Sequence, residues 1–339
     1  MKNENEIMFI KVHENQIKEI TEFLIKHKVI FHPIISPTGI PDFTNYKGRK
    51  FILILDRNIL VLILDLVQAG TLNDPHKLKL VSSLLFWCDL NQITPTSGFA
   101  LMEHSHVQGN SLESGIQHNI FQSIYKKYSP NDWLELALGI KSSIPIIDDV
   151  IKSESEYLVY NEHQTLNYLQ VLKICQLYFI KNMNREDKLV EFYNWSYENL
   201  IIGMYSTFYA IMFFSSRTKL EPKILSAQPE ELFEKCKNVA WDLTYLSYWS
   251  TLFWNDKKKK KVFLFSTRDK EIKELFSLLH SDPQKAYTKA LGKKLGEKIK
   301  KKFESIHKSR PKRTFEKKKL EEKVFEEETR LTNLRENAI

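Results

Sequence analysis

The chain has 339 residues, of which 42% are hydrophobic and 27% are charged, and it contains only 10 Gly and 11 Pro. This composition excludes a disordered or loop-dominated protein and supplies enough apolar residues for one large domain or two ordinary ones. The three cysteines, Cys88, Cys175 and Cys236, form no CxxC pair, which indicates a reducing compartment and argues against a zinc site.

The first predicted elements are a strand at residues 7–12 and a helix around residues 16–27. A stretch that contains Pro and Gly then separates these elements from Phe51. We therefore interpret residues 1–46 as an N-terminal appendage on the main domain. The opening residues lack the long apolar segment of a secretory signal, so we expect a cytoplasmic protein.

Residues 51–55 form a continuous apolar run, FILIL, that ends at Asp56. Such a run is typical of a strand buried on both faces, as in a parallel sheet covered by helices. Helical spacing resumes at Asn58 and stops at Gly70. Asp56 would either stand at a strand end where open α/β sheets bind ligands, or cap the next helix. A capping role would tolerate Asp56→Asn, because Asn caps a helix about as well as Asp does.

The middle of the chain is mostly helical by its spacing. Residues 92–95 predict a short extended piece, residues 98–225 predict helices, and residues 230–252 predict a helix rich in aromatic residues. Residues 199–216 contain no charge, but the run is short for a bilayer and contains Asn, Ser, Thr and Tyr. We interpret it as a buried core helix rather than a membrane span.

A second apolar run, VFLFS at residues 262–266, is followed by Thr267, then Asp269, and then a predicted helix. The pattern repeats the one at Asp56. If both strands belong to one parallel sheet, Asp56 and Asp269 stand at the same edge, where two carboxylates can come together.

Two further acids lie on predicted helices between these strands. Glu103 follows Ser97 in PTSGFALMEHS, and Asp242 lies in the apolar and aromatic stretch NVAWDLTYLSYWS. The next Lys or Arg after Asp242 is Lys257, fifteen positions further on, so a hard divalent cation is a natural partner for the Asp242 carboxylate. The nearby pair His104 and His106 is interpreted as structural, because positions i and i+2 point to different sides of a helix.

The basic charge gathers in the last part of the chain. Residues 284–339 hold 18 Lys and Arg and 9 Asp and Glu, a net charge of +9, whereas the whole chain carries +8. This distribution indicates a polyanion that meets a helical tail with a joint at residues 309–313. The alternative is a solvated helix, since Lys and Glu interleave there. The residues expected to contact nucleic acid are Lys298, Lys300, Lys301, Lys302, Arg310, Lys312 and Arg313.

The order of these motifs resembles that of PIN-like nucleases, and the resemblance covers roughly residues 50–110 and 235–280. The shared pattern is a strand with D-x-N, a Ser-led helix with a Glu, an Asp in an apolar helix, and a strand with T-x-D. About 125 mostly helical residues separate Glu103 from the helix that bears Asp242. This connection is much longer than in a compact PIN domain, although larger bacterial PIN-like proteins carry such insertions.

The resemblance implies an α/β fold with three α/β/α layers around a short central parallel sheet. The PIN-like domain would span residues 47–283, with a helical insertion over about residues 107–230, and residues 284–339 would form a basic helical tail. The implied activity is hydrolysis of phosphodiester bonds, more in RNA than in DNA, with Mg²⁺ or Mn²⁺. The implied metal ligands and catalytic residues are Asp56, Glu103, Asp242 and Asp269, and the supporting residues are Asn58, Ser97 and Thr267.

The implied partner is nucleic acid and not a membrane, and the resemblance leaves room for an inhibitory or complex-forming protein and for a homo-oligomer. Proteins of this kind often act as toxins or in phage defence. A reading from a different class is a non-catalytic helical protein that binds nucleic acid or a partner. Asp56 and Asp269 would then be helix caps, Glu103 a surface residue and Asp242 a core polar residue. Convergence of the four carboxylates distinguishes the two readings, because they would repel phosphate without a metal.

Overall fold

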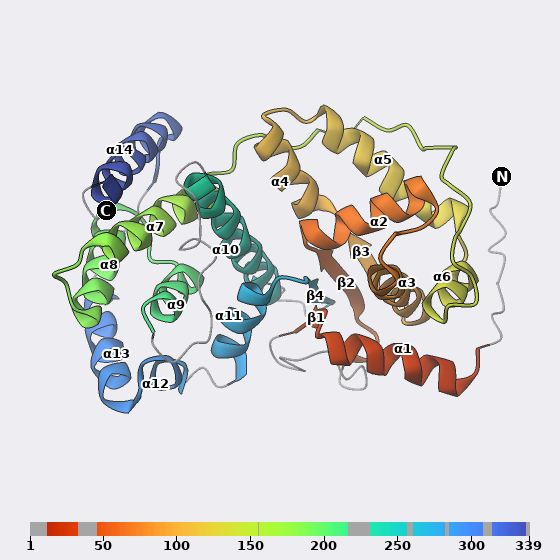
Figure 1. The fold of residues 1–339 in the computed structure, drawn as a ribbon, viewed down its shortest axis with the longest axis horizontal. Helices are drawn as coiled ribbons and strands as arrows, with labels where there is room; N and C mark the ends of the chain where they lie inside the picture. The colour runs from red at the N-terminus through yellow and green to blue at the C-terminus, as the bar shows by residue number, and fades with distance from the viewer. Residues whose placement is uncertain are drawn as a thin grey trace. The chain divides into compact units, whose positions relative to one another are not determined.

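The computed structural model describes residues 12–32, 46–154, 156–215, 231–255, 260–281, 285–307 and 314–336. The chain divides into two compact units, of which unit 1 comprises residues 1–159 and 253–268 and unit 2 comprises residues 160–252 and 269–339. The described chain is mostly helical with a small mixed sheet, so the broad α/β class predicted from the sequence is confirmed (Figure 1).

Unit 1 contains a four-stranded sheet with the strand order β1-β4-β2-β3. The strands are β1 (Ile30–Phe31), β2 (Lys50–Leu55), β3 (Thr94–Thr96) and β4 (Lys261–Ser266). Strand β2 lies between β4 and β3 and is parallel to both, whereas β1 pairs antiparallel with β4. The strands predicted at residues 51–55 and 262–266 are therefore confirmed. The prediction of a purely parallel sheet is wrong, because a short strand from the N-terminal region adds an antiparallel edge.

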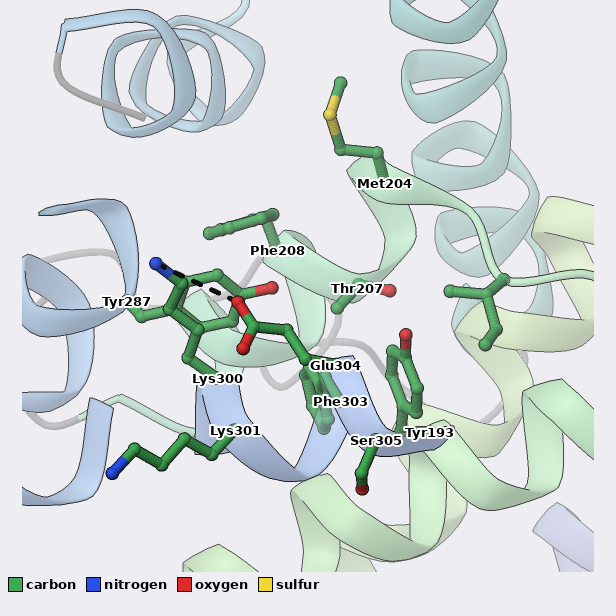
Figure 2. A pocket seen from close by; sticks show the side chains of 11 residues that line it. Tyr193, Met204, Thr207, Phe208, Tyr287, Lys300, Lys301, Phe303, Glu304 and Ser305 are labelled. Carbon is green, nitrogen blue, oxygen red and sulfur yellow. Dashed lines mark ion pairs between the residues drawn. The ribbon is translucent and has the colours of Figure 1, made fainter. Parts of the chain in front are cut away.

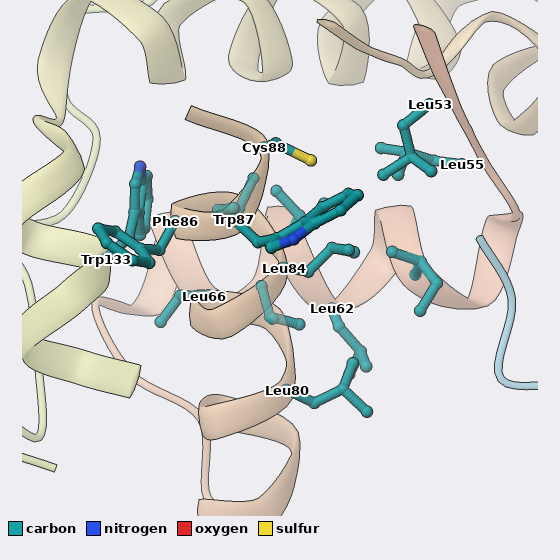
Figure 3. Packing of buried hydrophobic residues seen from close by; sticks show 14 of the residues in the cluster. Leu53, Leu55, Leu62, Leu66, Leu80, Leu84, Phe86, Trp87, Cys88 and Trp133 are labelled. Carbon is teal, nitrogen blue, oxygen red and sulfur yellow. The ribbon is translucent and has the colours of Figure 1, made fainter. Parts of the chain in front are cut away.

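Six helices in the described part of unit 1 surround this sheet: α1 (Glu14–His27), α2 (Arg57–Ala69), α3 (Pro75–Leu90), α4 (Gly98–Gln108), α5 (Leu112–Lys127) and α6 (Pro130–Ala137). Helix α3 packs against α1 and α6, and helix α2 packs against α4 and α5. The apolar run of β2 is buried as its continuous pattern predicted. Figure 3 shows Leu53 and Leu55 of β2 in one cluster with Leu62 of α2 and with Leu84 and Trp87 of α3.

The described part of unit 2 is helical. Its helices are α7 (Glu162–Phe179), α8 (Arg185–Asn199), α9 (Met204–Phe213), α10 (Leu232–Asn255, whose last residues belong to unit 1), α11 (Lys270–Ser281), α12 (Ala286–Leu291), α13 (Lys293–His307) and α14 (Lys317–Glu336). The uncharged run at residues 199–216 contains α9, and eight of that helix's residues are buried in unit 2. It is thus a core helix, as predicted. In the part of the chain that the structure describes, no helix is long and apolar enough to cross a membrane.

The two compact units have other bounds than the predicted domains. Contacts between residues far apart in the sequence place the N-terminal region in unit 1 and the C-terminal helices in unit 2. Strand β1 pairs with β4, and the N-terminal region belongs to unit 1. Helix α13 packs against α8 and α14 packs against α7, so the tail is a structural part of unit 2. The predicted insertion divides between the units, with α5 and α6 in unit 1 and α7 to α9 in unit 2. The joint predicted at residues 309–313, and all but the last residue of the predicted strand at residues 7–12, lie outside the described residues.

Candidate functional site

The carboxyl ends of β2 and β4 stand side by side in unit 1. The two strands are parallel and in register from Lys50 opposite Lys261 to Leu55 opposite Ser266. The backbone N–H of Asp56 continues the pairing by donating to the carbonyl oxygen of Ser266 at 3.0 Å. Asp56 and Thr267 therefore follow neighbouring strands at the same edge of the sheet.

The Asp56 carboxylate is buried, with 3% of the residue exposed, and its donors include three described groups. The backbone N–H of Arg57 donates to Oδ1 at 2.6 Å. The side chains of Asn58 and Thr267 both donate to Oδ2. A buried carboxylate requires such hydrogen bonds, because its charge is otherwise costly to remove from water. Asp56 occupies the N-cap position of α2, so the capping role considered from the sequence is present.

Asn58 joins the two strand ends and has a defined orientation. Its Oδ1 accepts the backbone N–H of Arg268 at 3.1 Å, and its Nδ2 also lies 3.2 Å from Thr267 Oγ1. Because a backbone N–H only donates, the amide oxygen must face Arg268 and the amide nitrogen must face Asp56. The D-x-N spacing thus places Asn58 so that its amide nitrogen donates to the acid while its amide oxygen accepts from Arg268.

The sequence reasoning missed a chain of polar side chains that begins next to Asp56. Arg57 Nη1 donates to Gln117 Oε1 at 2.6 Å, and Gln117 Nε2 lies 3.3 Å from His104 Nε2 and 3.4 Å from Glu113 Oε1. Burial, followed by the positive charge of Arg57, lowers the pKa of His104, so the imidazole is neutral at pH 7. Two features of the sequence indicate this chain of side chains: Arg57 is the middle residue of the D-x-N motif, and His104 is the first histidine of the His-x-His pair.

Glu103 and Ser97 lie on α4 in unit 1. Glu103 is half-buried, and Ser97 is buried at the N-cap of α4, where its side chain makes no capping hydrogen bond. The second histidine of the pair, His106, contacts the carbonyl oxygen of Val159 through Nδ1 at 2.8 Å. That backbone contact agrees with the structural interpretation of His106.

Asp242 and Asp269 belong to unit 2. Asp269 precedes α11, and its Oδ1 accepts the backbone N–H groups of Glu271 at 2.7 Å and Ile272 at 3.1 Å, which is the capping role. Asp242 is half-buried on α10 and lines a small gap of about 10 Å³ together with Tyr209 and Glu271. Burial, then the charges of Glu271 and Asp242 among others, raises the pKa of the Tyr209 phenol well above its usual value.

The four predicted ligand carboxylates are thus distributed over both units, two in each. Among the described residues, no group of three or more His, Cys, Asp or Glu side chains is arranged to hold a metal ion. Convergence of Asp56, Glu103, Asp242 and Asp269 stays a prediction.

The predicted nucleic-acid lysines divide into two faces of α13. Lys298 and Lys302 both pair with Glu186 of α8, at 2.6 and 3.3 Å, and so contribute to the packing of unit 2. Lys300 and Lys301 instead line a cavity of about 690 Å³ within unit 2. Arg310, Lys312 and Arg313 lie outside the described residues. On α14 the exposed Lys and Glu side chains form i,i+4 pairs, as a solvated helix does.

Comparisons of the chain with protein-family models, with curated proteins and with solved structures find no match.

Proposed function

We propose that unit 1 is a PIN-like α/β/α nuclease domain that hydrolyses phosphodiester bonds, more in RNA than in DNA, at the carboxyl edge of β2 and β4. The observation that carries the proposal is the parallel pairing of these strands, which joins Asp56, Asn58 and Thr267 in one hydrogen-bonded network. Ligand sites of open α/β sheets occur at this edge.

The carboxylate at this edge is a ligand of the type that a hard divalent cation prefers. Mg²⁺ in nucleic-acid enzymes commonly binds through one or two carboxylates, with water and substrate phosphate completing its ligands. Asp56 would hold the ion, and Asn58, Thr267 and the Arg57 backbone N–H would fix the carboxylate in one orientation. Such an ion makes water nucleophilic near neutral pH and neutralises charge on the phosphodiester.

The remaining residues of the edge supply positive charge and orientation. Gln117 Oε1 accepts a hydrogen bond from the Arg57 guanidinium and so orients it. The guanidinium is suited to hold a substrate phosphate close to Asp56. Neutral His104 adds no second positive charge beside Arg57, and it keeps Gln117 in place through the contact at 3.3 Å. Glu103, on α4 of the same unit, would supply a further carboxylate ligand.

A second candidate function is non-catalytic binding of nucleic acid or of a partner. One specific observation favours it: three hydrogen bonds and the N-cap position of α2 account for a buried Asp56 without any ion. In this case the edge of the sheet is a structural joint, and the basic residues of unit 2 carry the function.

Cleavage of labelled single-stranded RNA and DNA, with Mg²⁺, with Mn²⁺ and with chelator, separates the two functions. We expect wild-type cleavage that depends on the metal and falls more than about 100-fold in Asp56→Asn. The matched control is Asp65→Asn, which removes an exposed acid from the same helix and should cleave like wild type. Cleavage that persists in Asp56→Asn, or that ignores the chelator, would leave only the binding function.

A further inference from the structure

A cavity of about 690 Å³ lies within unit 2 and is lined by residues of α8, α9, α12 and α13. Its volume is within the range of pockets that hold small molecules and cofactors. The cavity takes no part in the hydrolysis proposed for unit 1, and the inference drawn from it does not depend on that activity.

Four of the residues that line this cavity carry aromatic rings (Figure 2). Tyr193 of α8 and Phe303 of α13 are stacked at 3.8 Å between centroids with an interplanar angle of 8°. Tyr287 of α12 lies 6.2 Å from Phe303 and 4.8 Å from Phe208 of α9. Tyr193, Phe208 and Phe303 are buried, so packing holds the rings in place before any ligand arrives. Tyr287 is the most exposed of the four rings, so a flat, aromatic ligand would meet the Tyr287 ring and the accessible edges of the other three.

Two lysines give the cavity its charge. Lys300 lies 4.0 Å from Glu304, its ion-pair partner, as the dashed line in Figure 2 shows. Lys301 has no ion pair with any residue that the structure describes. The charged residues of the described lining are Lys300, Lys301 and Glu304, which leaves a net charge of +1. Lys298 and Lys302 differ, because Glu186 already neutralises them. The cavity therefore favours an anion.

Hydroxyl groups complete the lining. Thr207 Oγ1 donates to the carbonyl oxygen of Gly203 at 2.7 Å, so the hydroxyl keeps its acceptor capacity towards the cavity. Burial, with smaller contributions from Tyr193 and Glu304, raises the pKa of Tyr287 to about 12, so its phenol stays a donor at neutral pH. An acceptor and a donor near flat rings match the polar edge of a nucleobase.

We propose that this cavity binds a nucleotide, with its base against the ring wall of Tyr193, Phe208, Tyr287 and Phe303 and its phosphate at Lys300 and Lys301. The combination of stacking surface and lysine charge is the one that proteins use for nucleotides of single strands, and it equally suits a free mononucleotide. A nucleotide within a single strand and a free mononucleotide are the two possible sources of this ligand, and both present a base and a phosphate to the cavity.

Calorimetric titration of the full chain with adenosine 5′-monophosphate, adenosine, inorganic phosphate and a single-stranded RNA hexamer tests the site. We expect adenosine 5′-monophosphate to bind more tightly than adenosine or phosphate, since only the nucleotide uses both ring wall and lysines. Much tighter binding of the hexamer that is weakened by Lys301→Gln identifies the source as a strand, whereas equal binding of hexamer and nucleotide identifies a free nucleotide. If the wild-type chain binds neither the nucleotide nor the hexamer, the proposal is overturned.

The variant Lys301→Gln should weaken nucleotide binding about tenfold, the usual value of one charge-assisted hydrogen bond to phosphate. Its matched control is Lys294→Gln, which removes an exposed lysine from the same helix away from the cavity. Tyr287→Phe should reduce binding of adenosine and of the nucleotide alike, because it removes only the hydroxyl. Equal losses in Lys301→Gln and Lys294→Gln, or unchanged binding in both, would contradict the assignment. Asp65→Asn should bind like wild type, and chelator in the titrations keeps metal-dependent hydrolysis out of the measurement, so failure of the nuclease proposal is read separately.

Discussion

The hydrogen bonds around Asp56 predict that its replacement by Asn destabilises unit 1, although Asn is normally an equivalent cap. With its oxygen towards the Arg57 N–H, an Asn at this position would turn its amide nitrogen towards the Asn58 amide, which also donates. With the amide reversed, the nitrogen would face the Arg57 backbone N–H. Asn58 itself is not free to reverse, because its oxygen accepts the Arg268 N–H. Either arrangement sets two donors against each other.

The size of the effect follows from these contacts. Asp56→Asn removes a charge-assisted hydrogen bond and leaves a buried donor unsatisfied, which together cost about 2–4 kcal/mol of unfolding free energy. Asn58→Asp should also destabilise unit 1, because it places a second carboxylate beside that of Asp56. The double variant Asp56→Asn/Asn58→Asp restores the pattern, since the new amide donates to the new carboxylate, which also accepts from Arg268. We expect a favourable coupling of about 2 kcal/mol.

Urea unfolding of wild type, both single variants and the double variant measures this coupling, and hydrogen exchange of the β2 and α2 segments locates it in unit 1. Asp65→Asn on the same helix should change stability by less than about 0.5 kcal/mol. The double variant should regain stability but not metal-dependent cleavage, because the carboxylate has moved by two residues. Additive losses in the double variant, or an Asp56→Asn protein as stable as wild type, would refute the reasoning.

Two further predictions concern stability. Burial raises the pKa of the Asp89 carboxyl from 3.8 in the unfolded chain to about 6 in the folded protein. The protonated carboxyl therefore stabilises the fold fully below pH 3.8, and this contribution is lost as the pH rises through 6. In urea unfolding, Asp89→Asn should therefore gain about 1–2 kcal/mol relative to wild type between pH 4 and pH 7, after discounting for partial exposure; a pH-independent difference would contradict this. Gly70 has φ of +74°, and an added Cβ would meet the Ile144 carbonyl oxygen at 2.6 Å, whereas Gly48 has φ of +77° with nothing within 4 Å. Gly70→Ala should cost roughly 2 kcal/mol or more and Gly48→Ala about 1 kcal/mol by thermal or urea unfolding; equal losses would show that the Ile144 backbone yields.

The sequence by itself determined the local pieces of the candidate site. The unbroken apolar run before Asp56 predicted a buried strand, and β2 is one, because a strand covered on both faces needs no polar alternation. The same pattern predicted β4 and placed Thr267 directly after it. Helix α2 follows the predicted spacing and ends at Gly70 in the left-handed conformation that suits glycine. Patterns of this kind depend on neighbours within a few residues, which the sequence displays directly.

Tertiary structure decided which distant residues meet. Cys175 and Cys236 are 61 residues apart and share no motif, yet their sulfurs lie 3.7 Å from each other. Helical spacing distinguishes the faces of α13, but only packing against α8 shows that Lys298 and Lys302 meet Glu186 while Lys300 and Lys301 line a cavity. Two partners of Asn58, Thr267 and Arg268, likewise follow a strand more than 200 residues further along the chain. Such contacts arise from the packing of whole helices and strands, and a side chain's own neighbours in sequence carry no record of them.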